Sequence, residues 1–201
     1  MVNGRAMDID EQLRRATEYV VFKKYREATD IYNRLAADVG DFDEDERIAF
    51  HAAGLTQWAE MSKETQDFSD IMRYRDDRLE QIFSTVSCDD VVDVLRINND
   101  LGRYDDNLRL YDRLKESARP VLTEIWETYG LLFFGPALIA DKRWDEIEEY
   151  CDLEKDFSFY IQGSRYFDEN ELGAYEKYAS HLQNHKILKS IDTIRRNGKM
   201  V

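Results

Sequence analysis

The stretch from Gln12 to Leu35 reads QLRRATEYVVFKKYREATDIYNRL and decides the fold class of this chain. Its apolar residues recur at intervals of three and four: Leu13, Ala16, Tyr19, Val20, Ala28, Ile31, Tyr32 and Leu35. Side chains at these intervals fall on one face of an α-helix. We therefore predict two amphipathic helices, at about 8–22 and 24–38, that pack as an antiparallel pair.

The same spacing continues along the chain, interrupted by helix start and stop signals. Gly40 ends the second helix, and Asp43 with Glu46 three residues later is an N-cap signal for the next. Gly102 marks a turn, and Pro120 stands where the first turn of a helix tolerates proline. These signals predict an all-α fold in which residues 1–156 form helix pairs at about 8–38, 44–84, 88–118 and 119–155.

The segment 157–167 departs from the helical spacing. Six large apolar side chains surround Gly163 there without a period of three or four: Phe157, Phe159, Tyr160, Ile161, Tyr166 and Phe167. We predict an aromatic loop. Because Tyr, Phe and Arg are the residues enriched at interface hot spots, this loop either contacts a partner or folds onto the end of its own repeat array.

The last segment, 168–201, is predicted as a C-terminal capping helix with a basic amphipathic end. Its late apolar residues Ile187, Ile191 and Ile194 fall on the side opposite Leu182. Two alternatives follow. Either the helix breaks near Asn184, or one long helix presents a second face to a partner or to a second copy of the chain.

Three places in the sequence look alike. An aromatic residue begins a similar helix at Tyr25, Tyr104 and Trp144, and these residues lie 79 and 40 positions apart. This pattern resembles the second helix of a tetratricopeptide repeat, most closely over residues 12–35 and also over 89–114. Because the period of about forty exceeds that of the strict family, it is equally similar to a Sel1-like or HEAT-like array. The resemblance implies a right-handed α–α superhelix of about four antiparallel helix pairs, which bury their faces by stacking.

The resemblance also implies which residues face the groove of such a superhelix. The inner face of the first helices would include Leu13, Thr17, His51, Leu55, Val92, Arg96 and Asn99. Family members that hold a C-terminal carboxylate use Lys and Asn at positions that Leu13 and Thr17 occupy here. Capture of a chaperone tail is therefore not expected.

Charge narrows the classes of partner. The chain has 42 Asp and Glu residues against 28 Lys and Arg, a formal net charge of −14. Such a chain does not suit nucleic acid or an anionic membrane, because both bind clustered Lys and Arg. The basic residues of the C-terminal end are Lys186, Lys189, Arg195, Arg196 and Lys199. Cys88 and Cys151 are expected to be reduced thiols in a cytoplasmic protein.

Motifs for catalysis are absent from the sequence. His181 and His185 share a helix face, but two ligands without a third predict exposed histidines rather than a metal site. No phosphate-binding glycine loop or nucleophile elbow is present. We therefore expect no enzyme activity, no metal and no cofactor.

The sequence thus predicts a non-catalytic scaffold or adaptor that binds a protein or peptide partner, a basic one included, in a helical-repeat groove. An alternative is an acidic immunity-type protein or inhibitor that neutralises a basic toxin or effector by surface complementarity. A homodimer through the C-terminal helix also stays open. The candidate contact residues are His51, Leu55, Arg96, Asn99, Phe159, Tyr160, Arg165, Tyr166, Lys189, Arg195 and Arg196.

Overall fold

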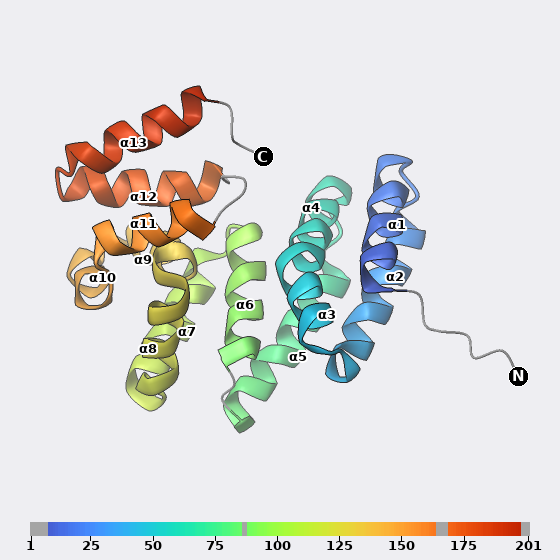
Figure 1. The fold of residues 1–201 in the computed structure, drawn as a ribbon. Coiled ribbons are helices and arrows are strands. Elements are labelled where there is room, and N and C mark those ends of the chain that lie inside the picture. The colour runs from blue at the N-terminus through green and yellow to red at the C-terminus, as the bar shows by residue number, and fades with distance from the viewer. Residues whose placement is uncertain (1–7, 86–87, 164–168, 198–201) are drawn as a thin grey trace, which may run out of the picture. The chain divides into compact units, whose positions relative to one another are not determined.

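The computed structural model of this chain describes residues 8–85, 88–163 and 169–197. These residues form helices joined by short links, with no strand among them, which confirms the predicted all-α class (Figure 1). The chain divides into two compact units, Met1–Gly102 and Arg103–Val201. We call them the N-terminal and C-terminal units. The division falls inside the predicted third pair, 88–118.

The N-terminal unit begins with the predicted helix pair. Its elements in order are α1 (Ile9–Val21), α2 (Tyr25–Asp38), the 3₁₀ turn η1 (Val39–Asp41), α3 (Glu44–Ala49), the π-helical turn η2 (Phe50–Gly54), α4 (Leu55–Thr65), α5 (Ser69–Thr85) and α6 (Cys88–Asp100). Local sequence signals set these boundaries. The side chain of Asp43 accepts a hydrogen bond from the backbone N–H of Glu46, and the side chain of Glu46 accepts one from Asp43, so the predicted N-cap is confirmed.

The core of the N-terminal unit contains the apolar residues that the spacing singled out. Tyr32 of α2 stacks on Trp58 of α4, with ring centroids 5.6 Å apart and both side chains nearly inaccessible. The other large core side chains of this unit include Leu13, Ile31, Leu35, Phe50, Leu55, Ile71 and Ile97. Helix α1 packs on α2 and also on α3 and η2, while α4 packs on α6. Figure 1 shows α1, α4 and α6 side by side within this unit.

The C-terminal unit has more and shorter helices than the sequence predicted. Its elements are α7 (Tyr104–Ser117), α8 (Arg119–Tyr129), the 3₁₀ turn η3 (Gly130–Leu132), α9 (Gly135–Ala140), α10 (Trp144–Tyr150), α11 (Leu153–Gly163), α12 (Glu169–His181) and α13 (His185–Arg196). None of the described helices of either unit combines the length and apolar character that a membrane crossing requires.

The prediction of one helix pair over 119–155 is wrong. Helix α8 ends at Tyr129, because the next residue, Gly130, has a positive φ of 55° that does not continue a right-handed helix. Pro136 lies in the first turn of α9, where its missing N–H costs nothing, so a separate helix starts there. Cys151 is extended, with φ −108° and ψ 112°, and it separates α10 from α11.

The prediction of a loop over 157–167 is also wrong for the described residues, because 157–163 belong to α11. Phe157 and Tyr160 are buried three positions apart on one face of that helix, and both pack on Tyr175 of α12. Apolar side chains on the other faces, at Phe159 and Ile161, hid this spacing. Residues 164–167 lie outside the described part of the chain.

Of the two alternatives near Asn184, the structure shows the break. Helix α12 ends at His181, Gln183 adopts a φ of 53°, and the side chain of Asn184 accepts a hydrogen bond from the N–H of Ile187. The chain then turns back, so Ile187 and Ile191 are buried where α13 packs on α12. The change of apolar face reflects this reversal.

Candidate functional site

The candidate site lies on the exposed side of α1, of the continuous helix α3–η2–α4, and of α6, which we call the first-helix face. Side-chain contacts join these helices in two places, which we call seams: Thr17–Gln57 between α1 and α4, and Thr56–Asp100 with His51–Asp93 along α6. On one side, Thr17 of α1 donates to the side-chain oxygen of Gln57 at 3.1 Å. On the other, Thr56 donates to the carboxylate of Asp100 at 3.1 Å. The seams hold the helices at a set spacing.

His51 is the centre of the second seam. Its Nδ1 lies against a carboxylate oxygen of Asp93, and the Asp93 side chain is only 1% exposed. The hydroxyl of Tyr74 donates to the other oxygen of Asp93 at 2.8 Å. Burial raises the pKa of Tyr74, which keeps its hydroxyl protonated as a donor. His51 therefore links two helices and does not stand free in a groove.

Sequence reasoning selected His51 but missed Asp93. A signal was present, because Asp93 lies within the apolar run from Val91 to Leu95 of α6. A carboxylate in such a run is buried with its neighbours and needs donors from other helices. One donor, the hydroxyl of Tyr74, comes from α5, and His51 of η2 lies against the second carboxylate oxygen.

The π-helical turn η2 places Thr56 on the same side of the helix as His51, so that both contact α6. Within η2, Gly54 comes so close to Phe50 and to Leu13 of α1 that a Cβ would lie 2.8 Å and 3.1 Å from their side-chain carbons. A π-helical turn adds one residue to the normal helical repeat and shifts the positions that follow. Arg47 lies before this turn, His51 lies at its start, and Thr56 lies after it. All three contact α6.

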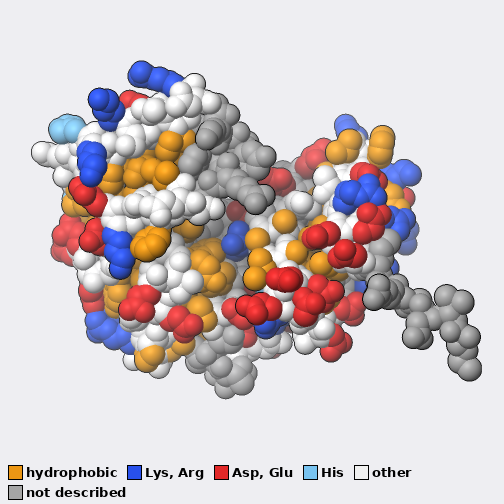
Figure 2. Space-filling model, in the orientation of Figure 1, with side chains coloured by type: hydrophobic (Ala, Val, Ile, Leu, Met, Phe, Trp, Pro, Cys, Tyr) orange, Lys and Arg blue, Asp and Glu red, His pale blue; other side chains and the backbone are white. Residues whose placement is uncertain are grey.

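Between the two seams an apolar line remains open. Ile48 is 58% exposed, and Ala52 and Ala53 are also exposed. We define the apolar line as these three residues. Figure 2 shows hydrophobic side chains over α3 and α4 with Asp and Glu side chains beside them. Neither seam uses the apolar line, so it is free to contact another molecule.

The other predicted residues of this face divide into two groups. Leu13, Leu55 and Val92 are buried, at 5%, 0% and 6% exposure, and belong to the core. Leu55 is therefore not a contact residue: its position one turn from His51 points inward. Arg96 and Asn99 of α6 are half-buried.

The predicted aromatic residues of α11 also divide. Phe159 is 63% exposed, whereas Tyr160 is 7% exposed and packs on Phe157 and Tyr175. Tyr160 is therefore a core residue. Arg165 and Tyr166, predicted with them as contacts, lie outside the described residues.

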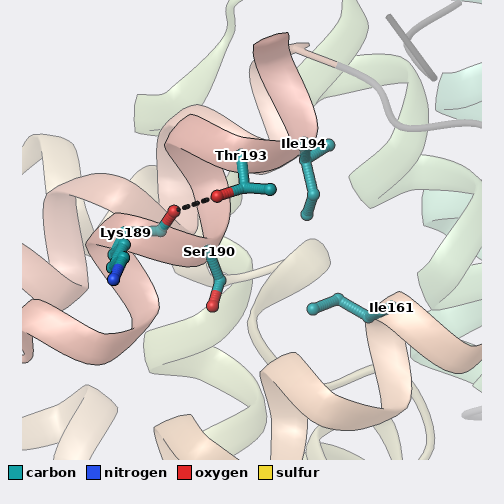
Figure 3. Close-up of a pocket in the computed structure, with 5 residues that line it drawn as sticks. All are labelled: Ile161, Lys189, Ser190, Thr193 and Ile194. Atoms are coloured by element: carbon teal, nitrogen blue, oxygen red, sulfur yellow. Dashed lines mark hydrogen bonds between the residues drawn. The ribbon is translucent and has the colours of Figure 1, made fainter. Parts of the chain in front are cut away.

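Three predicted residues lie on α13. Arg195 donates to Glu169 and Glu176 of α12, and these hydrogen bonds raise its pKa and fasten the last helix to its neighbour. Arg196 is exposed. Lys189 lies at a shallow cavity of about 330 Å³ that is also lined by Ile161, Ser190, Thr193 and Ile194. Figure 3 shows Ile161 of α11 and Ile194 pointing toward each other across this cavity.

Comparison with known proteins gives no further guide to this site. No protein-family description, no curated protein and no solved structure matches the chain.

Proposed function

We propose that this chain is a non-catalytic scaffold that binds a segment of a partner protein on the first-helix face of its N-terminal unit. The observation that carries the proposal is the apolar line, Ile48, Ala52 and Ala53, left open between two hydrogen-bonded seams. The proposal includes a tetratricopeptide-like arrangement of this unit. This arrangement is supported by the packing of α1 on α2, of α1 on α3 and η2, and of α4 on α6.

The apolar line suits a peptide segment for steric reasons. Two successive alanines leave room for a backbone to approach the helix, and Ile48 offers a larger apolar surface beside them. Complete burial of an isoleucine side chain contributes about 1.5–3 kcal/mol, enough for one anchor contact. The buried stack of Tyr32 and Trp58 and the seams keep the surface rigid, so little conformational entropy is lost on binding.

The acidic surroundings of the line favour a partner with basic residues beside its apolar anchor. Glu44, Asp45 and Glu46 lie in the first turn of α3, and Asp89 lies in the first turn of α6. Complementary charge of this kind raises association rates and selects among partners.

Substitution of Ile48 by Glu tests the proposal. The carboxylate would be left at the centre of the contact, so we expect affinity for the partner to fall by about tenfold or more, equivalent to about 1.4 kcal/mol or more. A photo-crosslinking residue at Ala52, used in cells of the native organism, would identify the partner. Calorimetry with that partner would then compare the variants.

Val21→Glu is the matched control, because Val21 is a 71% exposed aliphatic residue of the same unit that lies outside the apolar line. It should bind like the wild type. Equal affinities of Ile48→Glu and wild type, with unchanged circular dichroism, would refute the assignment of this face.

A further inference from the structure

A hollow of the N-terminal unit lies away from the apolar line, between α2, α4 and the start of α5. It has a volume of about 460 Å³, and its lining includes Arg26, Thr29, Asp30, Trp58, Met61 and Asp70. Pockets that bind small ligands have volumes of about 300–1,000 Å³. We call this hollow the acidic groove.

The floor of the acidic groove is part of the rigid core. Trp58, Met61 and Ser62 of α4 are 1%, 4% and 1% exposed. Trp58 is stacked on Tyr32, and the hydroxyl of Thr29 lies 4.0 Å from the sulfur of Met61. The groove is therefore formed before any ligand arrives, which limits the entropy lost on binding.

The mouth of the acidic groove carries carboxylates from three elements. Asp30 belongs to α2, Asp67 to the link before α5, and Asp70 to α5. Asp67 accepts hydrogen bonds from the N–H and hydroxyl of Ser69, and the hydroxyl lowers its pKa, which keeps it ionised. Arg26 is the cation of the lining, so the lining carries three formal negative charges against one positive.

Two charged side chains beside the acidic groove, Arg73 and Glu64, already have partners. Arg73 donates to Asp70 at 2.6 Å and to the side-chain oxygen of Asn33 at 3.3 Å. Tyr25 donates to Glu64 at 2.6 Å. Asp30, by contrast, makes no ion pair with any described residue. It is the carboxylate most available to a ligand.

We propose that the acidic groove receives the side chain of an arginine from a basic segment of a partner protein. A guanidinium group presents five N–H donors in a planar fork, and the carboxylates, the hydroxyl of Thr29 and the carbonyl of Asn33 are acceptors at the mouth. The apolar stem of arginine fits over a floor of Trp58 and Met61. This site extends beyond the first-helix face and does not depend on it.

Other ligand classes fit the acidic groove less well. An anion would meet Asp30 and Asp67, which have no cationic partner among the described residues, and their repulsion opposes binding. A wholly apolar group would bury the polar rim without replacing its hydrogen bonds to water, which costs free energy. Lysine carries the same charge as arginine, but its ammonium is a compact point charge without the planar fork.

A peptide titration tests the proposal on the full-length chain. The probes are three capped tripeptides, Gly-Arg-Gly, Gly-Lys-Gly and Gly-citrulline-Gly, where citrulline is the uncharged isostere of arginine. Amide shifts in two-dimensional NMR spectra should appear at Thr29, Asp30 and Met61 with the arginine peptide. The lysine peptide should bind more weakly, and the citrulline peptide should produce no comparable shifts.

Substitutions locate the contact. Asp30→Asn should weaken binding of the arginine peptide by about two- to fivefold, the range of an exposed ion pair, and Asp30→Lys should abolish it. Asp105→Asn removes the same charge from an exposed position of the other unit and should leave affinity unchanged. Ile48→Glu should also leave it unchanged, which separates this site from the first-helix face. Equal shifts with citrulline, or equal affinity for wild type and Asp30→Asn, would overturn the proposal.

Discussion

Buried carboxylates connect helices in both units. In the N-terminal unit Asp93 joins η2 and α5 to α6 through His51 and Tyr74. In the C-terminal unit Asp156 accepts hydrogen bonds from the N–H of Leu131 at 2.8 Å and the hydroxyl of Tyr175 at 3.1 Å. Burial raises the pKa of Asp156, although these donors oppose the rise. Each carboxylate satisfies donors that would otherwise be unpaired inside the protein.

Glu146 shows the opposite effect at a partly exposed position. Hydrogen bonds from Arg143 and Lys115 lower its pKa to about 2, against an ordinary value of 4.5, although burial opposes them. A lowered carboxyl pKa stabilises the fold above the unfolded value and loses that contribution as the pH falls toward the folded one. The stabilisation by Glu146 is therefore complete above about pH 4.5 and is lost between there and about pH 2.

Glu146→Gln should lower the free energy of unfolding by about 1 kcal/mol at pH 7. The effect is no larger because the ion pairs of Glu146 with Arg143 and Lys115 are partly solvated. The difference from wild type should shrink as the pH falls from about 4.5 to 2. Urea unfolding at a series of pH values measures it. The exposed Glu124 makes no ion pair with a described residue, so Glu124→Gln should have the same free energy of unfolding as wild type at every pH. A constant difference at all pH values for Glu146→Gln would contradict the role of this carboxylate.

The link between α8 and α9 depends on one glycine. Gly130 has φ 55° and ψ −131°, a conformation that L side chains rarely adopt. A Cβ on Gly130 would lie 1.8 Å from a carboxylate oxygen of Asp156, which holds the next residue, Leu131. The turn that ends α8 and the buried carboxylate therefore require the same glycine.

Gly130→Ala should lower the free energy of unfolding by about 2–4 kcal/mol, since both strain and displacement of Asp156 contribute. Gly173→Ala is the control of opposite sign. Gly173 lies inside α12, and no other group lies within 4 Å of the place that a Cβ would take, so alanine should stabilise by about 0.5–1 kcal/mol. Guanidinium unfolding curves measure both. A Gly130→Ala protein as stable as wild type would rule out this account of the turn.

The molecule as a whole carries a formal charge of −14, which bears on both proposed modes of binding. Binding through the apolar line depends chiefly on burial of apolar surface, with a smaller contribution from the acidic residues beside it, and should therefore depend only weakly on salt. Neutralisation of a basic toxin or effector, the alternative mode, depends on charge attraction between surfaces. The dependence of affinity on salt concentration therefore distinguishes the two modes of binding.

Raising NaCl from about 0.1 M to 1 M shortens the screening length from about 10 Å to about 3 Å. For the scaffold we expect the partner's Kd to change by less than about tenfold, mostly through a slower association rate, whereas an acidic inhibitor should lose affinity by about a hundredfold or more. Surface plasmon resonance across this salt range measures both rates. A steep salt dependence that Ile48→Glu does not alter would favour the inhibitor.

Local chemistry explains how much of the fold was predictable from sequence. The pair α1–α2, the cap at Asp43 and the helix start at Pro120 depend on residues within a turn or two of one another. Such contacts are set by neighbouring residues and are visible in sequence. The helix over 157–163 is not evident from the sequence, because Phe159 and Ile161 are apolar although they are exposed. They obscure the three-residue spacing of the buried pair Phe157 and Tyr160.

The sequence by itself determined that the chain is all-helical and acidic, and it marked most helix starts. Tertiary structure alone decided which apolar residues are core and which are surface, as with Leu55 and Ile48. It also brought His51 to Asp93 and gathered Asp30 and Asp70 around one hollow. The reason is physical: periodicity assigns a side chain to a face of its own helix, whereas only the packing of several helices determines what that face meets.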